Sequence, residues 1–252
     1  MKKTILIVIL FTTTFLTSFS QFKGNTLISV TGGAAFPLGK YASDNVNDHE
    51  AGTAKTGGSV SISAARFLSK NFGVALDLHG QRNPINTTTF EEEFNKEYTN
   101  FPGWKFKKTK WSFGAIMVGA VGQFYVDHSK KLSFVAKATA GVMFAKLPGL
   151  EGTSNSFERY GHADQTRERG NGFVFSYSAG LTYPIFKKIF IVADARFLAS
   201  GPISFNNVVT KINTIHGAPG SPYSVYQNIT NTVSGTQKIS SVNISLGLAF
   251  QF

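Results

Sequence analysis

The sequence contains no cysteine among its 252 residues. This absence excludes disulfide bonds, cysteine-ligated metal sites and cysteine nucleophiles. It also excludes a lipoprotein anchor, because that anchor needs a cysteine at the signal cleavage site. If the chain is exported, it must therefore be stabilised by a packed core or by a closed network of backbone hydrogen bonds.

Long apolar runs are missing after the first 20 residues. Residues 1–20 begin with Met-Lys-Lys, continue with an apolar and hydroxyl-rich stretch, and end in Ser18-Phe19-Ser20. This pattern predicts a secretory signal peptide that is cleaved before Gln21. No later run reaches the roughly 20 apolar residues that a transmembrane helix needs. We therefore expect residues 21–252 to form one domain without helical membrane spans.

Acidic residues are scarce, with 14 Asp and Glu against 25 Lys and Arg, so the formal net charge is +11. Loss of Lys2 and Lys3 with the signal peptide would leave 11 − 2 = +9. Such basicity can indicate a nucleic-acid partner, but export argues against one. Anionic headgroups or lipopolysaccharide phosphates are more natural partners for an exported basic protein. Lys and Arg that merely keep loops solvated would explain the charge equally well.

The rest of the chain is rich in segments in which every second residue is apolar. Each is close to the length of a tilted strand that crosses a bilayer. We identify eight such segments, at residues 26–38, 57–68, 72–81, 109–126, 132–144, 172–183, 189–198 and 239–252. In the sixth, Phe173, Phe175 and Tyr177 share one face, and Val174, Ser176 and Ser178 share the other.

The connections between these segments alternate in length. Residues 69–71, 127–131 and 184–188 are short turns, whereas residues 39–56, 82–108, 145–171 and 199–238 are long polar loops. Long loops are uncommon inside a compact soluble domain, but they alternate with tight turns in outer-membrane barrels. The sequence therefore predicts an all-β fold, an eight-stranded antiparallel up-and-down transmembrane β-barrel with short periplasmic turns and four long extracellular loops.

Aromatic residues gather near the ends of the expected strands, where the two interfaces of a bilayer would lie. This set comprises Phe67, Phe72, Trp111, Tyr125, Phe144, Phe173, Tyr183 and Phe197. We expect them to form two girdles that face lipid. Arg66 shares a face with Val60 and Ile62, so we expect either a β-bulge or a side chain that snorkels to the interface.

Four charged residues fall on the faces that we assign to the lumen, namely Asp77, Lys137, Asp194 and Arg196. An eight-stranded barrel is only wide enough for side chains to fill it. Unpaired buried charges are costly, and two acids can neutralise two bases. We expect an internal ion-pair network that plugs the lumen; a proton or ion path through the same residues is the alternative.

The last eleven residues, VNISLGLAFQF, form an amphipathic strand that ends in an aromatic residue. This segment resembles the C-terminal signal of Gram-negative outer-membrane barrels. The segments GVALDLHG and GFVFSYSAGLTYPIFKKIFIVADARF are similar to those of small bacterial outer-membrane β-barrel domains of the OmpA/OmpX type and of PorT-like porin-family proteins. The resemblance implies location in a Gram-negative outer membrane. It also implies that the barrel-assembly machinery reads Leu246, Leu248, Phe250 and Phe252.

Residue patterns that would indicate catalysis or metal binding are weak. The five histidines, His49, His79, His128, His162 and His216, form no close ligand pair. We therefore expect no metal and no cofactor. A lipid-A-modifying enzyme would need a nucleophile and base at the membrane edge, and His79 is the only candidate base at membrane level. No GxSxG segment occurs.

Basic residues near the outer ends of the expected strands could contact lipopolysaccharide phosphates. These residues are Lys105, Lys107, Lys108, Arg167 and Arg169. The main hypothesis is a non-enzymatic integral outer-membrane barrel that acts as a structural platform, with surface loops for binding or adhesion. Its partner would be an extracellular or envelope protein or a soluble ligand, and no nucleic acid. A lipid-A-modifying enzyme and a narrow channel or transport-associated barrel are the alternatives.

Overall fold

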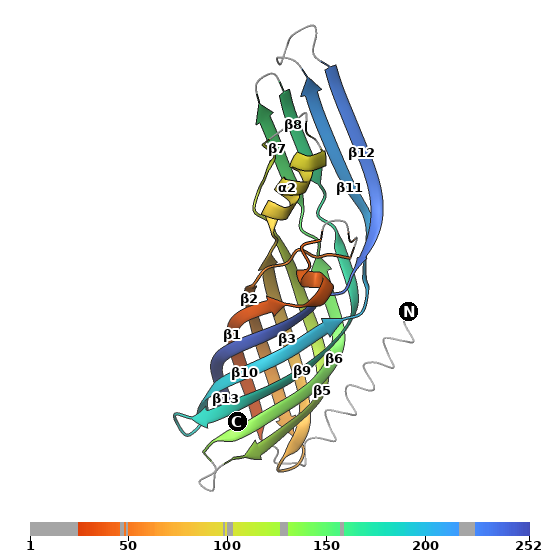
Figure 1. The fold of residues 1–252 in the computed structure, drawn as a ribbon. Coiled ribbons are helices and arrows are strands. Elements are labelled where there is room, and N and C mark those ends of the chain that lie inside the picture. Colours follow the sequence, from red (N-terminus) through yellow and green to blue (C-terminus); the bar gives the residue numbers. More distant parts are fainter. Residues whose placement is uncertain are drawn as a thin grey trace, which may run out of the picture.

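Eight antiparallel strands form a closed barrel (Figure 1). The computed structural model describes residues 25–45, 48, 50–97, 99, 103–126, 131–156, 159–216 and 225–252, so the predicted signal peptide lies outside the described residues. The order around the barrel is β1-β13-β10-β9-β6-β5-β3-β2, with β2 paired to β1. The strands are β1 (Thr26–Pro37), β2 (Gly57–Phe67), β3 (Phe72–Pro84), β5 (Lys110–Tyr125), β6 (Ser133–Lys146), β9 (Arg169–Pro184), β10 (Ile189–Ser200) and β13 (Ser240–Gln251).

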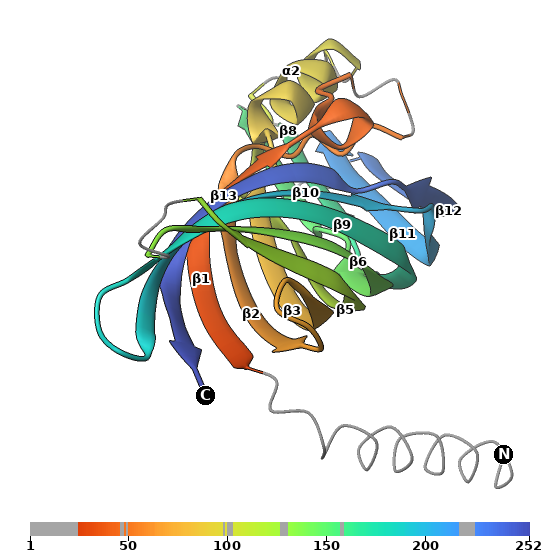
Figure 2. The same cartoon turned by 90° about the horizontal axis from the view of Figure 1, so that it is seen from below.

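The eight predicted strands and their alternating connections are confirmed. Short turns join β2 to β3, β5 to β6 and β9 to β10 at one end of the barrel. The C-terminus lies at the same end (Figure 2), where the backbone N–H of Phe252 donates to the carbonyl oxygen of Thr26 at 2.9 Å. Four strands, β3, β6, β9 and β10, reach further toward the other end than the sequence pattern predicts.

The alternation along each strand separates an apolar outer face from a packed inner face. In β13, Leu246 and Leu248 are 66% and 55% exposed, whereas Asn243 and Ser245 are 1% and 6% exposed. Apolar side chains that point out of a closed barrel suit a hydrocarbon environment, in which every backbone group must be paired within the protein. The closed ladder of strand pairs provides that pairing.

Six of the eight expected girdle aromatics point outward: Phe72, Tyr125, Phe144, Phe173, Tyr183 and Phe197. The prediction was wrong for Phe67 and Trp111, which are buried on the inner faces of their strands. Phe67 lies on the same face of β2 as the inward-facing Ser61 and Ser63. Because side chains alternate with a period of two, an aromatic residue at a strand end is as easily on the lumen side as on the lipid side.

Arg66 is accommodated without a β-bulge. The pairing of β2 with β1 and with β3 runs without a break through this residue. Its Nη1 donates to the hydroxyl oxygen of Thr26 at 3.0 Å, at the end of the barrel that carries the short turns. This position matches the expected snorkelling side chain.

Three of the four long loops contribute strands to a second sheet beyond the barrel (Figure 1). Its strand order is β12-β11-β8-β7-β4. The strands are β4 (Lys105–Phe106), β7 (Leu150–Ser156), β8 (Arg159–Gln165), β11 (Ile203–His216) and β12 (Val225–Gln237), and the loops also contain η2 (Gly39–Ala42) and α2 (Thr87–Glu97). Among the described residues, neither helix has the length and apolar character required to cross a membrane.

The outer sheet has a small core of its own. Trp104, Phe106 and Ile212 are buried there. Phe94 of α2 packs edge-on against Trp104, with ring centroids 5.3 Å apart, and against Phe106 at 4.9 Å. Trp104 is completely buried, which assigns it to this core.

Candidate functional site

The four charged residues expected in the lumen lie together at its centre. Asp77 Oδ1 is 3.5 Å from Lys137 Nζ, and Asp77 Oδ2 is 3.1 Å from Arg196 Nη2. Arg196 Nε is also 3.9 Å from Asp194 Oδ2. The arrangement balances two acids with two bases inside the barrel, which removes most of the cost of an unpaired buried charge.

Uncharged polar side chains continue from this centre toward the outer mouth. The Ser61 hydroxyl lies 2.8 Å from His79 Nδ1, and His79 Nε2 lies 3.3 Å from Gln81 Oε1. Gln81 Nε2 then donates to Asn83 Oδ1 at 2.7 Å, and the Ser241 hydroxyl donates to Gln81 Oε1 at 3.1 Å. These side chains are buried and hydrogen-bonded to one another, so they fill the upper lumen.

Apolar side chains close the other end of the lumen. Ala65, Phe67, Ala75 and Val121 form a buried cluster there. The space left beside Lys137 is about 30 Å³, which is room for about two water molecules. The described lumen is therefore a packed interior rather than an open pore.

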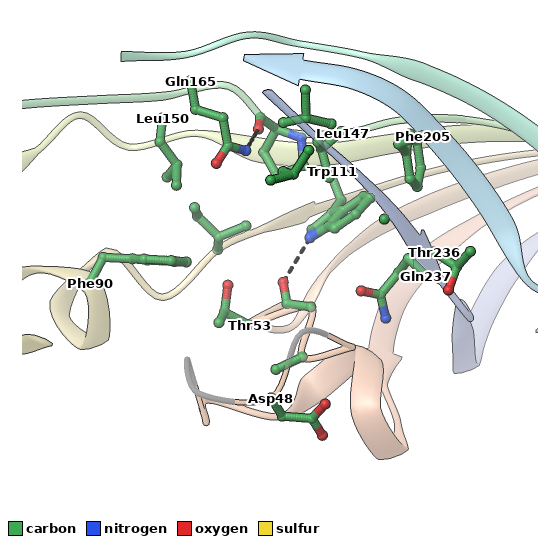
Figure 3. Close-up of a pocket in the computed structure, with 17 residues that line it drawn as sticks. Asp48, Thr53, Phe90, Trp111, Leu147, Leu150, Gln165, Phe205, Thr236 and Gln237 are labelled. Carbon is green, nitrogen blue, oxygen red and sulfur yellow. Dashed lines mark hydrogen bonds between the residues drawn. The ribbon is translucent and has the colours of Figure 1, made fainter. Parts of the chain in front are cut away.

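A pocket of about 230 Å³ lies between the barrel mouth and the outer sheet (Figure 3). Its wall is mainly apolar and includes Trp111, Phe90 of α2, Leu150 and Phe205 of β11. Figure 3 shows the Trp111 ring reaching into this space while its Nε1 donates to the carbonyl oxygen of Gly52 at 2.8 Å. A cavity of this size and lining suits a small apolar group.

Tyr41 supports this pocket from η2. Its ring packs edge-on against Trp111, with centroids 5.7 Å apart, and its hydroxyl donates to Asn83 Oδ1 at 3.3 Å. Burial raises the pKa of the Tyr41 phenol above its usual range, because the phenolate would lose its hydration. The loop between β1 and β2 is thus anchored both to the polar lumen and to the pocket wall.

The five basic residues proposed for lipopolysaccharide contact divide into two groups. Lys105 Nζ lies 3.2 Å from Glu91 Oε2, and Lys107 forms an ion pair with Glu151. These two lysines therefore pair with acids of the outer sheet and α2. Lys108 and Arg167 instead line a groove at the outer end of the barrel, and Arg169 begins β9 beside that groove.

The residues of the suggested assembly signal occupy the outward face of β13. Leu246, Leu248, Phe250 and Phe252 are all exposed, and the rings of Phe250 and Phe252 pack edge-on at 4.6 Å. Their recognition by the assembly machinery stays a prediction.

Among the described residues, no group of three or more His, Asp or Glu side chains is placed to hold a metal ion. His79, the candidate base at membrane level, faces the lumen and is 5% exposed. It is therefore not at the membrane edge, where a lipid-modifying base would have to act.

The closed barrel, the lipid-facing apolar surface and the filled lumen define a small transmembrane β-barrel of the outer-membrane class. No protein-family model and no curated protein matches the chain. Among solved structures, the chain is similar to Ail, the attachment invasion locus protein of Yersinia pestis, at 11% identity and a TM-score of 0.43, covering 92% of this chain and 100% of Ail. It is also similar to Neisserial surface protein A at 12% identity and a TM-score of 0.44, covering 90% and 97%.

A third similar structure is the outer membrane protease OmpT from Escherichia coli, at 7% identity and a TM-score of 0.44, covering 92% of this chain and 98% of OmpT. At such identities and TM-scores the matches assign no activity.

Proposed function

We propose that this chain is a non-enzymatic outer-membrane barrel that carries a rigid β-sheet outside the cell as a binding platform. The observation that supports this proposal is the outer sheet itself. Three of the four loops contribute strands to this sheet, which has its own aromatic core, so the sheet holds a fixed shape beyond the membrane. Loops that are fixed on a rigid scaffold commonly carry binding.

The free edge of β12 is the part of the platform that we propose to bind. Among the strands of the described residues, β12 is the last in the sheet order and pairs only with β11. Residues 227–236 are exposed along nearly their whole length. An edge strand of this kind offers unpaired backbone groups to an extended segment of another protein, which would bind by adding a strand.

The packing of the lumen favours the platform over a narrow channel. Ion pairs, hydrogen-bonded side chains and an apolar cluster fill it in succession. The purified barrel should therefore give no conductance steps in a planar lipid bilayer. Regular steps would favour the channel instead.

The position of His79 favours the platform over an enzyme. Its ring contacts the Ser61 hydroxyl, but both side chains are enclosed in the lumen. Lipid A from cells with and without the gene should therefore have the same composition. A difference in its acyl chains or phosphates would support the enzyme.

The proposed function also requires export of the chain to the outer membrane. We infer that the chain resides in a Gram-negative outer membrane after removal of residues 1–20, because these residues have the pattern of a signal peptide. Sequencing of the mature N-terminus should then begin at Gln21.

The platform is tested by shortening the outer hairpin. Residues 212 and 229 are opposite each other in β11 and β12, so replacing residues 212–229 with Asn-Gly removes the tip and keeps the lower pairing. Cells that display the parent protein should adhere to at least one member of a panel of immobilised fibronectin, laminin and collagen. Cells that display the shortened variant should not.

Heat-modifiable gel migration of both proteins controls for barrel folding. Equal adhesion by parent, shortened variant and empty cells on every surface would contradict the proposal.

A further inference from the structure

The outward face of four neighbouring strands carries a row of cations directly beyond the apolar belt. Across this face, Arg82 of β3 is opposite Ser112 of β5, Ser112 is opposite Lys146 of β6, and Lys146 is opposite Arg169 of β9. Like charges directly opposite each other destabilise a sheet. The pairing of Lys146 with Arg169 therefore lowers stability unless an anion lies between or above them.

A groove of about 520 Å³ opens at this row. Five cations line it: Arg82, Lys108, Lys110, Lys146 and Arg167. None of its lining residues is acidic, and none of the ion pairs found among the described residues involves these five cations. Lys40, Lys55, Lys105 and Lys107, by contrast, all pair with acids of the outer loops. The groove has the charge of a phosphate site.

A second groove, of about 660 Å³, adjoins the first on its membrane side and shares Arg82 and Ser112 with it. The strand pairing places Val60, Gly80, Gly114 and Phe144 side by side on the outward face. Val60 and Phe144 are 53% and 56% exposed and stand on either side of the two glycines. Because glycine has no side chain, the two glycines form the floor of a shallow channel between two apolar walls.

We propose that the two grooves together bind one molecule of lipid A, with a phosphate on the cations and an acyl chain over Gly80 and Gly114. The cations lie at the end of the barrel that carries the long loops, and lipid A occupies that leaflet. A soluble anion would use the basic groove but would leave the glycine-floored groove empty. A lipid with a phosphorylated headgroup uses both, and this match of charge and apolar shape selects it.

The headgroup half is tested with the double variant Lys110→Gln/Lys146→Gln. Native mass spectrometry of the barrel in detergent, titrated with bisphosphorylated lipid A, reports the bound fraction. Loss of a charge-assisted contact weakens binding roughly tenfold, so the double variant should bind at least that much more weakly. The matched control is Lys70→Gln/Lys187→Gln, which removes the same charge from the exposed turns at the opposite end. It should bind like the parent.

The acyl half is tested with Gly80→Leu/Gly114→Leu. A Cβ at either glycine has its nearest neighbour at 3.6 Å, so the barrel should fold while the channel is filled. This variant should lose lipid A but keep the parent's response to inorganic phosphate, read as protection of Lys110 from amine-reactive labelling.

Three outcomes would overturn the proposal. The first is that both groove variants bind lipid A as tightly as the parent does. The others are that the parent retains phosphatidylglycerol as well as it retains lipid A, or that it binds dephosphorylated lipid A as tightly as the bisphosphorylated form. Heat-modifiable migration verifies folding of each variant, and the charge variants keep the test decisive if the leucines prevent folding.

Discussion

Replacement of Asp77 tests the ion-pair network at the centre of the lumen. Its carboxylate is 1% exposed and contacts both Arg196, at 3.1 Å, and Lys137, at 3.5 Å. Asp77→Asn keeps the side-chain shape but leaves two cations with only Asp194 to balance them. Removal of one partner from a buried ion pair costs about 3–5 kcal/mol, so we expect the free energy of unfolding to fall by about that amount.

A double-mutant cycle separates this effect from a loss of packing. Arg196→Met alone should be similarly destabilising, because it leaves Asp77 with the more distant Lys137. The double variant restores neutrality, since Lys137 and Asp194 remain as one charge of each sign. We expect its loss of stability to be smaller than the sum of the single losses by about 2–3 kcal/mol.

Urea unfolding in lipid vesicles provides the measurement. The chain has two tryptophans, and a Trp104→Phe background leaves Trp111 at the barrel mouth as the reporter. Single variants within about 0.5 kcal/mol of the parent, with additive effects, would refute the network as described.

Gly119→Ala should lower the folded fraction on heat-modifiable gels, because its Cβ would collide with a carbonyl oxygen of the next strand. Gly80→Ala should fold like the parent, because a Cβ there meets only ordinary contacts. Equal folded fractions of the two variants would contradict this. Burial raises the pKa of the Tyr41 phenol, so the folded parent and Tyr41→Phe should show the same phenolate absorbance at 295 nm in alkali. The contribution of Tyr41 to stability should be fully present below the pKa of about 10 of an unfolded tyrosine and should fall as pH rises above it, as measured by unfolding. A phenolate signal that the folded parent shows and Tyr41→Phe lacks would refute this. The hydrogen bond from Lys107 lowers the pKa of the Glu151 carboxyl, so Lys107→Ala should raise that pKa in an NMR titration. The pair's small contribution to stability is present at neutral pH and is lost as pH falls through the pKa of Glu151 in the folded protein. An unchanged pKa in Lys107→Ala would show that the pair is absent in solution.

The barrel could be predicted from the sequence because two different environments act on alternate residues. In β13, Leu246 and Leu248 face lipid and Ser245 faces the lumen, so the period of two is visible in the residue types themselves. The same logic placed Asp77 and Arg196 on one inner surface, although it could not say which acid would contact which base.

The outer sheet was not predicted, because its strands have no such contrast. Strand β12 is exposed on nearly every residue, so its polar sequence resembles a loop. One signal was available: Phe90 and Phe94 are four residues apart, the spacing of one helix face, and they pack on Trp104 and Phe106. The basic groove was only partly foreseen, since its members are joined by cross-strand register rather than by position in the sequence.

The most direct test of the central account is the alternation of environment along β13 in lipid vesicles. Because the chain has no cysteine, single cysteines can be introduced from Val242 to Phe250 and spin-labelled. Labels at Ile244, Leu246 and Leu248 should collide readily with dissolved oxygen and little with an aqueous nickel chelate, while labels at Asn243 and Ser245 should be protected from both. Loss of this period of two, or greater access of the nickel chelate than of oxygen at Leu246, would contradict a lipid-facing barrel.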